Sequence, residues 1–205
     1  MTSDFPYLTR SEFGNCVEEF ERAYSSVVDV EVCKSRGSHT YLRIHKPLFL
    51  AQNDSDDAVD IDIEDVEDAD PALLDTTCPT LECGHIEYHV VYSASWRVPV
   101  LYVRVHTTTG VEMDCARVTD MLVTDSKVRG AMHAVEFGGA LGIQDHPELN
   151  EPFMYLHPCH TATLLRAVAP ARDGRRVEIG QRNYISAWLS LTGAAVGLFL
   201  PSIPH

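Results

Sequence analysis

The sequence lacks a long hydrophobic run. Within its 205 residues, no stretch reaches the roughly 18 uncharged apolar residues that a membrane-spanning helix needs. The most apolar segment, Ala194–Pro201, is much shorter than that. The first residues, MTSDFPYLTRSEF, also lack a basic region followed by an apolar one, so we expect no secretory signal. These absences argue against a membrane span and against secretion.

Basic residues are scarce as well. The 16 Lys and Arg residues face 30 Asp and Glu residues, which gives a formal net charge of −14. A surface of this sign repels polyanions, so we expect no nucleic-acid partner. The six cysteines show no regular disulfide framework and predict free thiols in a reducing compartment, hence a cytoplasmic protein. A hydrophobic content of 45% suits one domain spanning residues 1–205.

The negative charge is concentrated in one segment. Between Asp54 and Asp70 there are ten carboxylates and no basic residue, and without them the balance of the chain is −4. The acidity therefore belongs to an insertion at about residues 53–75, which we expect to be a mobile loop. The alternative is a docking segment for a basic partner surface. The segment lacks the glycine and the twelfth-position glutamate of an EF-hand, which disfavours calcium binding.

Four potential zinc ligands lie close together, but their spacing disfavours a metal site. One residue separates the middle two, whereas zinc modules usually bring together two separated pairs. The surrounding run His85–Tyr92 alternates as a strand does and places both of its histidines on the face opposite Ile86, Tyr88, Val90 and Tyr92. We therefore predict a strand here, and no metal. The four potential ligands are Cys78, Cys83, His85 and His89.

The order of predicted elements indicates an α+β fold. Thr9 and Glu12 have capping-box spacing and precede an apolar stripe of helical period. Strands follow in succession, which favours an antiparallel meander flanked by helices. A last helix is expected with Asn183 as its N-cap, ending at Gly193 or Gly197. The stripe of the first helix comprises Phe13, Val17, Phe20 and Tyr24, that of the last Tyr184, Ile185, Trp188 and Leu191, and the strands are expected at Val27–Cys33, Tyr41–Leu50, His85–Tyr92, Val98–Val105 and Phe153–Leu156.

The segment Pro152–Leu165, PFMYLHPCHTATLL, holds the best candidate for a reactive residue. In an extended chain His157 and Cys159 share one face, and Thr161 is placed to cap a short helix. A thiol beside an imidazole and near a helix start forms thiolate more readily, as a nucleophile requires. The alternative is that Cys159 packs as a small buried hydrophobe.

Three stretches together resemble the autophagy-related E2-like conjugating enzymes: EYHVVYSASWRVPVLYVRV, QDHPELNEPFMYLHPCHT and RNYISAWLSLTGAAVGLFLP. The resemblance implies an E2-like fold with extra strands and a thioester mechanism that needs no cofactor. It implies that Cys159 receives the ubiquitin-like autophagy-related protein twelve from the E1-like autophagy-related protein seven. It further implies transfer to a lysine of autophagy-related protein five, leaving an isopeptide bond.

The chain departs from the ubiquitin E2 pattern, in which His-Pro-Asn precedes the cysteine. Here His157 and Pro158 run directly into Cys159, so another residue must stabilise the transition state. His157 is the first candidate for an oxyanion or orienting role, and the alternative is a histidine satisfied by the backbone. Tyr88 and Tyr92 are further candidates, although core packing is the expected role of both; Asn183 is a helix cap or a donor. Two other functions remain open: a non-catalytic adaptor, and a cysteine hydrolase.

Overall fold

In the computed structural model, the described residues are 4–35, 37, 39–49, 82–123, 126, 127, 129, 141–169, 171, 172, 175, 176 and 179–202. The acidic segment at about residues 53–75 and Cys78 therefore lie outside the described residues. Among the described residues, no helix is long and apolar enough to cross a membrane.

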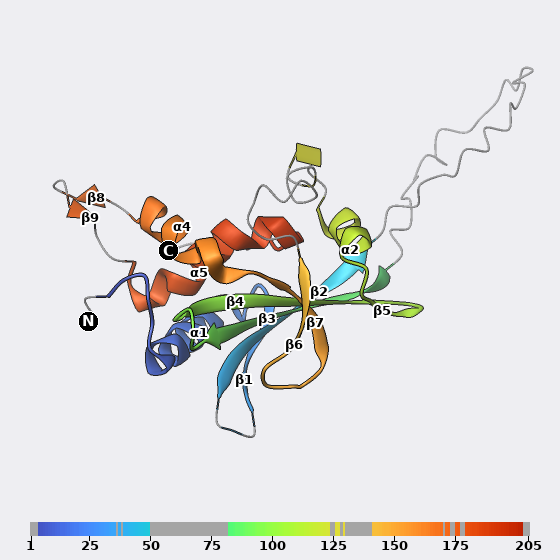
Figure 1. Ribbon diagram of the computed structural model, residues 1–205, viewed down its shortest axis with the longest axis horizontal. Helices are drawn as coiled ribbons and strands as arrows, with labels where there is room; N and C mark the ends of the chain where they lie inside the picture. Colours follow the sequence, from blue (N-terminus) through green and yellow to red (C-terminus); the bar gives the residue numbers. More distant parts are fainter. Residues whose placement is uncertain are drawn as a thin grey trace, which may run out of the picture.

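A seven-stranded antiparallel sheet forms the centre of the molecule (Figure 1). Its first four strands are consecutive in the chain and form the expected meander, and the strand before Cys159 pairs with the last of them. The α+β prediction is confirmed. In spatial order the strands are β1 (Asp29–Lys34), β2 (Thr40–Phe49), β3 (Glu82–Ser93), β4 (Val98–Thr107), β7 (Pro152–Leu156) and β6 (Gly142–Asp145), with β5 (Gly110–Glu112) beside β4. A separate hairpin joins β8 (Ala171–Arg172) and β9 (Arg175–Arg176).

Side chains alternate between two cores, one on each face of the sheet. The helix-side core joins Tyr88, Val103 and Met154 to residues of the helices. The second core, which we call the sheet-side core, lies on the opposite face of the sheet from these helices. It comprises Tyr41, Val91, Val100, Tyr102 and Phe153. The predicted alternation of β3 is confirmed, because Ile86, Tyr88 and Val90 belong to the helix-side core and Val91 to the sheet-side core.

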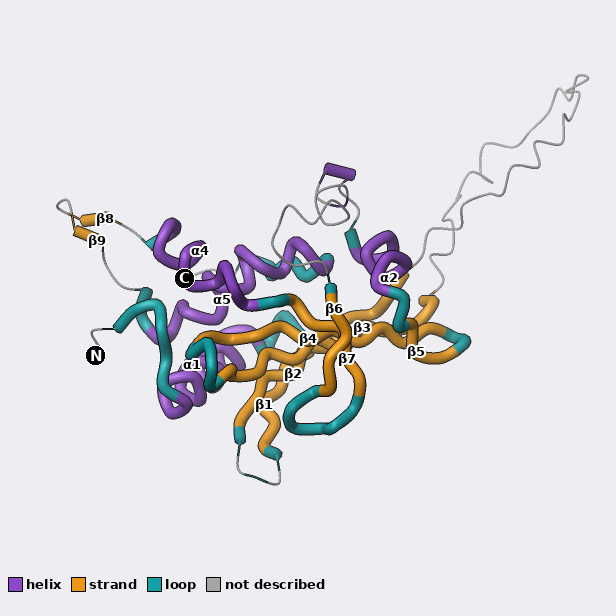
Figure 2. Tube along the Cα trace, viewed as in Figure 1, coloured by secondary structure: helices purple, strands orange, loops and turns teal. Residues whose placement is uncertain are grey.

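The helices pack on one face of the sheet, and Figure 2 shows their arrangement. Helix α1 begins after the predicted capping box, in which the Thr9 hydroxyl accepts from the Glu12 N–H at 3.2 Å and the Glu12 carboxylate accepts from the Thr9 N–H at 2.7 Å. This helix packs against the last one, α5. The helices are α1 (Arg10–Tyr24), α2 (Cys115–Leu122), α4 (Thr161–Val168) and α5 (Gln181–Thr192), with 3₁₀ turns η2 (Pro158–His160) and η3 (Gly193–Val196).

Two predicted caps are wrong. Helix α5 begins at Gln181 after an extended Gly180, so Asn183 lies exposed in its first turn and is not the N-cap. Thr161 is the first residue of α4 and not its N-cap, because η2 leads directly into that helix. Its side chain is buried. The predicted end of the last helix is confirmed: Gly193 is the C-cap of α5, and Gly197 ends η3 in the left-handed conformation.

Candidate active site

Cys159 lies in a tight turn between a strand and a helix. Strand β7 ends at Leu156, and residues Pro158–His160 form the 3₁₀ turn η2 before α4 begins. Proline suits the first position of such a turn, because its fixed φ matches the turn and its missing N–H would have had no partner there. Pro158 is buried, whereas Cys159 is half-buried. The thiol is thus carried by a short, anchored turn at the end of the sheet.

His157 caps this turn. Its backbone is extended, with φ −65° and ψ 131°, and its Nδ1 accepts a hydrogen bond from the Cys159 N–H at 3.2 Å. A neutral ring that accepts at Nδ1 carries its proton at Nε2. The prediction that an extended chain puts His157 and Cys159 on one face is wrong, because Cys159 belongs to a 3₁₀ turn. The two residues are instead joined by this ring-to-backbone contact.

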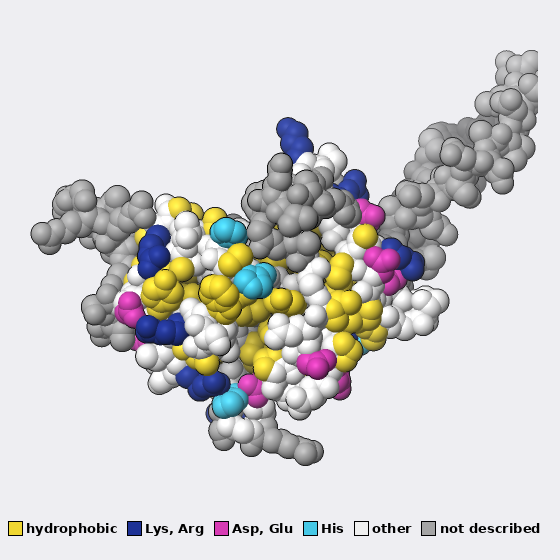
Figure 3. All heavy atoms as spheres, viewed as in Figure 1, with side chains coloured by type: hydrophobic (Ala, Val, Ile, Leu, Met, Phe, Trp, Pro, Cys, Tyr) yellow, Lys and Arg dark blue, Asp and Glu magenta, His cyan; other side chains and the backbone are white. Residues whose placement is uncertain are grey.

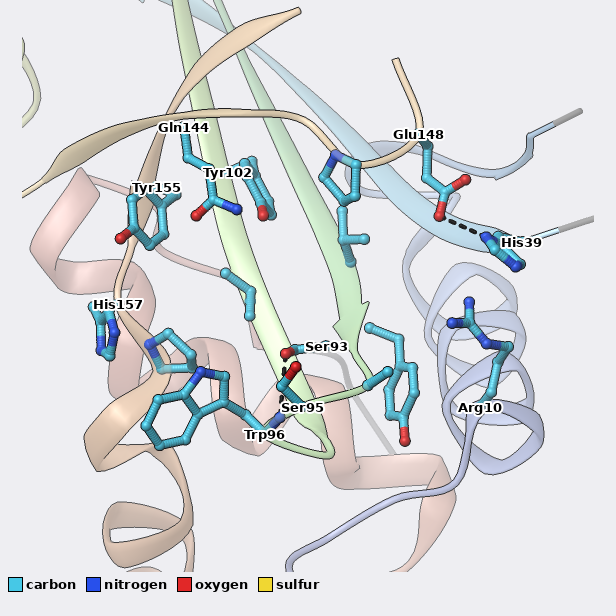
Figure 4. Close-up of a pocket in the computed structure, with 16 residues that line it drawn as sticks. Arg10, His39, Ser93, Ser95, Trp96, Tyr102, Gln144, Glu148, Tyr155 and His157 are labelled. Carbon is cyan, nitrogen blue, oxygen red and sulfur yellow. Dashed lines mark hydrogen bonds and ion pairs between the residues drawn. The ribbon is translucent and has the colours of Figure 1, made fainter. Parts of the chain in front are cut away.

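A groove of about 420 Å³ leads away from this turn along the end of the sheet. Figure 4 shows His157 and Trp96 at one end of it and His39 and Glu148 at the other, with Tyr155 near the first end. Trp96 belongs to the turn between β3 and β4, is 46% exposed, and meets the His157 ring edge-to-face at 5.4 Å between centroids. Aromatic rings therefore line the end of the groove next to Cys159.

The other end of the groove is polar. The Glu148 carboxylate is hydrogen-bonded to Nδ1 of His39 at 2.9 Å, and the Glu148 side chain is only 11% exposed. Glu148 lies in the loop between β6 and β7, and His39 precedes β2. Neither residue was foreseen as part of the site from the sequence, because 109 residues separate them and only folding brings them together.

The two tyrosine candidates lie in different places. Tyr88 is buried in the helix-side core, which agrees with its expected role in core packing, and its hydroxyl donates to the Val196 carbonyl at 2.9 Å. Tyr92 lines the groove, and its hydroxyl donates to the Leu8 carbonyl at 2.8 Å. Of the four predicted site residues, the structure brings His157 to Cys159 and places His157 and Tyr92 along one groove.

Three other cysteines are poorly suited to act as nucleophiles. Burial raises the pKa of the Cys16 thiol to about 12, and burial also raises the pKa of Cys33 and of Cys115. A thiol with a raised pKa yields less of the thiolate that attacks carbonyl groups. No cluster of three or more potential metal ligands occurs within the described ranges.

Comparison with known proteins identifies the family. The model of the family described as "Autophagocytosis associated protein, active-site domain" matches residues 11–203. Three curated relatives carry the name ubiquitin-like-conjugating enzyme ATG10. The human relative is 31% identical over 146 residues, which are 71% of this chain and 61% of that protein. The relative from Arabidopsis thaliana is 25% identical, covering 82% and 76% of the two chains, and that from Gibberella zeae is 24% identical, covering 97% and 96%.

A solved structure titled "Crystal structure of Autophagic E2, Atg10" aligns with 93% of this chain and 97% of that chain, at 12% identity and a TM-score of 0.48. The family model covers nearly the whole chain. The resemblance found in the sequence is confirmed, and the chain belongs to the autophagocytosis-associated family of E2-like, ubiquitin-like-conjugating enzymes.

Proposed function

We propose that the chain carries autophagy-related protein twelve as a thioester on Cys159 and transfers it to a lysine of autophagy-related protein five. The observation that carries this proposal is the position of Cys159, a half-buried cysteine in a turn whose preceding residues, His157 and Pro158, line the groove. Membership of the conjugating-enzyme family supports it. The autophagy-related protein seven is the proposed donor of the thioester.

The first step is a thioester exchange. The Cys159 thiolate attacks the C-terminal glycyl carbonyl of the ubiquitin-like protein, which is bound as a thioester to the E1-like enzyme. The carbon–sulfur bond to the E1 cysteine breaks as the new bond to Cys159 forms, and the E1 cysteine leaves as a thiolate. The step is close to neutral in energy, so the enzyme mainly needs to present an accessible and oriented thiol.

The second step forms the isopeptide bond. The uncharged amine of the acceptor lysine attacks the thioester carbonyl on Cys159 and gives a tetrahedral oxyanion. The carbon–sulfur bond then breaks, Cys159 leaves as a thiolate, and the nitrogen releases one proton to water. A thioester is already activated toward amines, so positioning of the amine and stabilisation of the oxyanion are the main requirements.

The groove supplies surface for this positioning. Trp96 is a large exposed aromatic residue next to His157, and aromatic side chains are enriched where proteins bind one another. Hydrophobic side chains also gather across the middle of the molecular face shown in Figure 3. Exposed apolar surface of this kind suits a protein partner.

His157 is proposed as a positioning residue. Its Nδ1 holds the Cys159 backbone, and the neutral ring presents its Nε2–H as a donor. A cysteine hydrolase that uses His157 as its base is disfavoured, because that histidine must take the proton of the thiol, whereas Nδ1 of His157 is engaged by the backbone N–H of Cys159. An adaptor role would make the thiol dispensable.

A charging assay tests the proposal. The chain is incubated with the E1-like enzyme, ATP and the ubiquitin-like protein, and adducts are separated with and without a thiol reductant. The wild-type chain should form a thiol-sensitive adduct, and Cys159→Ser should form a thiol-resistant ester or no adduct. Cys115→Ser is the matched control, because Cys115 is also half-buried, and it should charge like the wild type.

Two outcomes would contradict the proposal. A thiol-sensitive adduct on Cys159→Ser would move the chemistry to another cysteine. The absence of any adduct on the wild-type chain would favour the adaptor, which Cys159→Ala should leave fully functional.

A further inference from the structure

The loop between β6 and β7 is tied down by the buried side chain of His146. This side chain is fully buried, and its Nδ1 accepts hydrogen bonds from the backbone N–H groups of Glu148 at 3.2 Å and Leu149 at 3.3 Å. The His146 N–H also donates to the Glu151 carbonyl at 2.7 Å. The ring of His146 thus holds one side of the loop, and its backbone N–H holds the other.

The same ring connects the loop to the middle of the sheet. Nε2 of His146 lies 3.0 Å from Nδ1 of His89, and Nε2 of His89 lies 3.3 Å from the Glu87 carboxylate. Because Nδ1 of His146 accepts, its proton is on Nε2 and is donated to His89. The proton of His89 is then on Nε2 and is donated to Glu87. An arrangement in which both rings are neutral therefore satisfies all of these hydrogen bonds.

The surroundings favour that arrangement. Tyr41, Tyr102 and Phe153 pack around His146, with ring centroids 5.4, 5.1 and 4.9 Å away. Burial lowers the pKa of His89 and lowers that of His146 to about 4. The charged groups that act on the pair come from three strands and the loop: Arg43 on β2, Glu87 on β3, Arg104 on β4, and Glu148. The hydrogen bond from His89 lowers the pKa of Glu87, as does the charge of Arg104, which lies 3.3 Å from its carboxylate.

This chain of hydrogen bonds supports one wall of the groove. Pro147 and Glu148 line the groove, and they belong to the loop that His146 holds. Tyr102 lines it too and packs on His146. Glu148 is fixed from two sides, by His146 through its backbone and by His39 through its carboxylate. The wall opposite Trp96 is therefore set by a contact within the sheet-side core, away from Cys159.

We propose that His146 and His89 are positioning residues for the transfer step, in which they fix the groove wall that orients the acceptor. This inference rests on the proposed function. Charging requires only that Cys159 meet the E1 thioester. Transfer requires a second protein to place an amine about 3 Å from the thioester carbonyl, and a misplacement of about 1 Å can cost roughly a hundredfold in rate.

Two variants break the contact in different ways. His146→Asn keeps an acceptor for the Glu148 and Leu149 amides but is too short to reach His89. His89→Phe keeps a ring against Tyr41 and Phe153 but cannot accept from His146. His85→Ala is the matched control, because His85 lies on the same strand and the same face as His89 but is exposed at its far end.

The two half-reactions are measured separately in single-turnover assays. Charging is followed with the E1-like enzyme, ATP and the ubiquitin-like protein, and discharge is followed after the E1 is stopped and the acceptor is added. We expect His146→Asn and His89→Phe to charge within about twofold of the wild type and to discharge roughly tenfold more slowly. The double variant should discharge no more slowly than either single variant, because residues that act as one unit are not additive. His85→Ala should match the wild type in both steps.

Hydrogen exchange of the Glu148 and Leu149 amides shows whether the loop opens in each variant. Discharge within twofold of the wild type in variants whose loop has opened would overturn the inference. An equal fall in charging and discharge, with additive losses in the double variant, would also overturn it, because it would reveal a role in stability alone. A wild-type chain that fails to charge would instead refute the proposed function, so the two failures are distinguishable.

Discussion

At the scale of single residues, the site depends on how His157 meets Cys159. The imidazole accepts from the Cys159 N–H and so acts as the cap of a 3₁₀ turn. Asparagine is a good cap because its carboxamide oxygen accepts the same kind of hydrogen bond, whereas alanine offers no acceptor. Substitutions at this position therefore separate capping from imidazole chemistry.

We predict that His157→Asn retains transfer within about threefold of the wild type and that His157→Ala loses roughly fivefold. Loss of a cap costs about 1 kcal/mol, which corresponds to that factor in the equilibrium between the correct turn and its alternatives. The measurement is the single-turnover discharge rate of charged enzyme. His160→Asn is the control, because His160 lies on the other side of Cys159 and its side chain makes no capping hydrogen bond. Equal losses in His157→Asn and His157→Ala would show that the ring itself takes part in the chemistry.

At the scale of elements, the C-terminal turn η3 joins the helices to the sheet. Tyr88 of β3 donates to the Val196 carbonyl, and the Lys46 ammonium of β2 donates to the Gly197 carbonyl at 3.1 Å. Gly197 has φ +67°, and a Cβ placed there would lie 2.2 Å from the Leu122 carbonyl oxygen at the end of α2. Only glycine permits both the left-handed conformation and this close approach.

Gly197→Ala should therefore destabilise the fold by more than the roughly 1–2 kcal/mol that the left-handed conformation alone costs. The measurement is the free energy of unfolding in urea. Gly14→Ala is the matched control: Gly14 lies inside α1 with open space around its Cα, and alanine should stabilise that helix by up to about 1 kcal/mol. A neutral Gly197→Ala would mean that η3 moves away from α2 without cost.

Much of this architecture could be predicted from local patterns. Alternation along β3 gave the two faces of the sheet, and Thr9 with Glu12 gave the start of α1, because both signals act over a few residues. The turn at Cys159 was mistaken for extended chain, since the fixed φ of Pro158 fits either conformation. The contact between His89 and His146 could not be predicted, because 57 residues separate them and only tertiary folding brings them together. The groove could not be foreseen for the same reason.

At the scale of the whole molecule, two electrostatic effects oppose each other as the pH falls. The net charge of −14 makes the surface repel itself, and protonation of carboxylates relieves that repulsion. Ten of the 30 carboxylates lie within the segment Asp54–Asp70. In addition, 0.15 M salt screens charges that are more than about 8 Å apart. The buried histidines are not screened in this way. We therefore expect the buried pair to decide how stability depends on pH.

The free energy of unfolding should fall as the pH drops from about 6.5 to about 4. An unfolded histidine takes up a proton near pH 6.5, whereas burial lowers the pKa of His146 to about 4 in the folded chain. Between these values the unfolded state binds more protons, so acid favours unfolding. At about 1.4 kcal/mol for each pH unit, the loss from His146 approaches roughly 3 kcal/mol. The lowered pKa of Glu87 acts in the same direction below about pH 4.5.

Urea denaturation in 0.15 M salt at several pH values measures how the free energy of unfolding depends on pH. His146→Asn should flatten this dependence because it removes the buried imidazole. Stability that stays constant or rises from pH 7 to pH 5 would show that surface repulsion outweighs the buried pair.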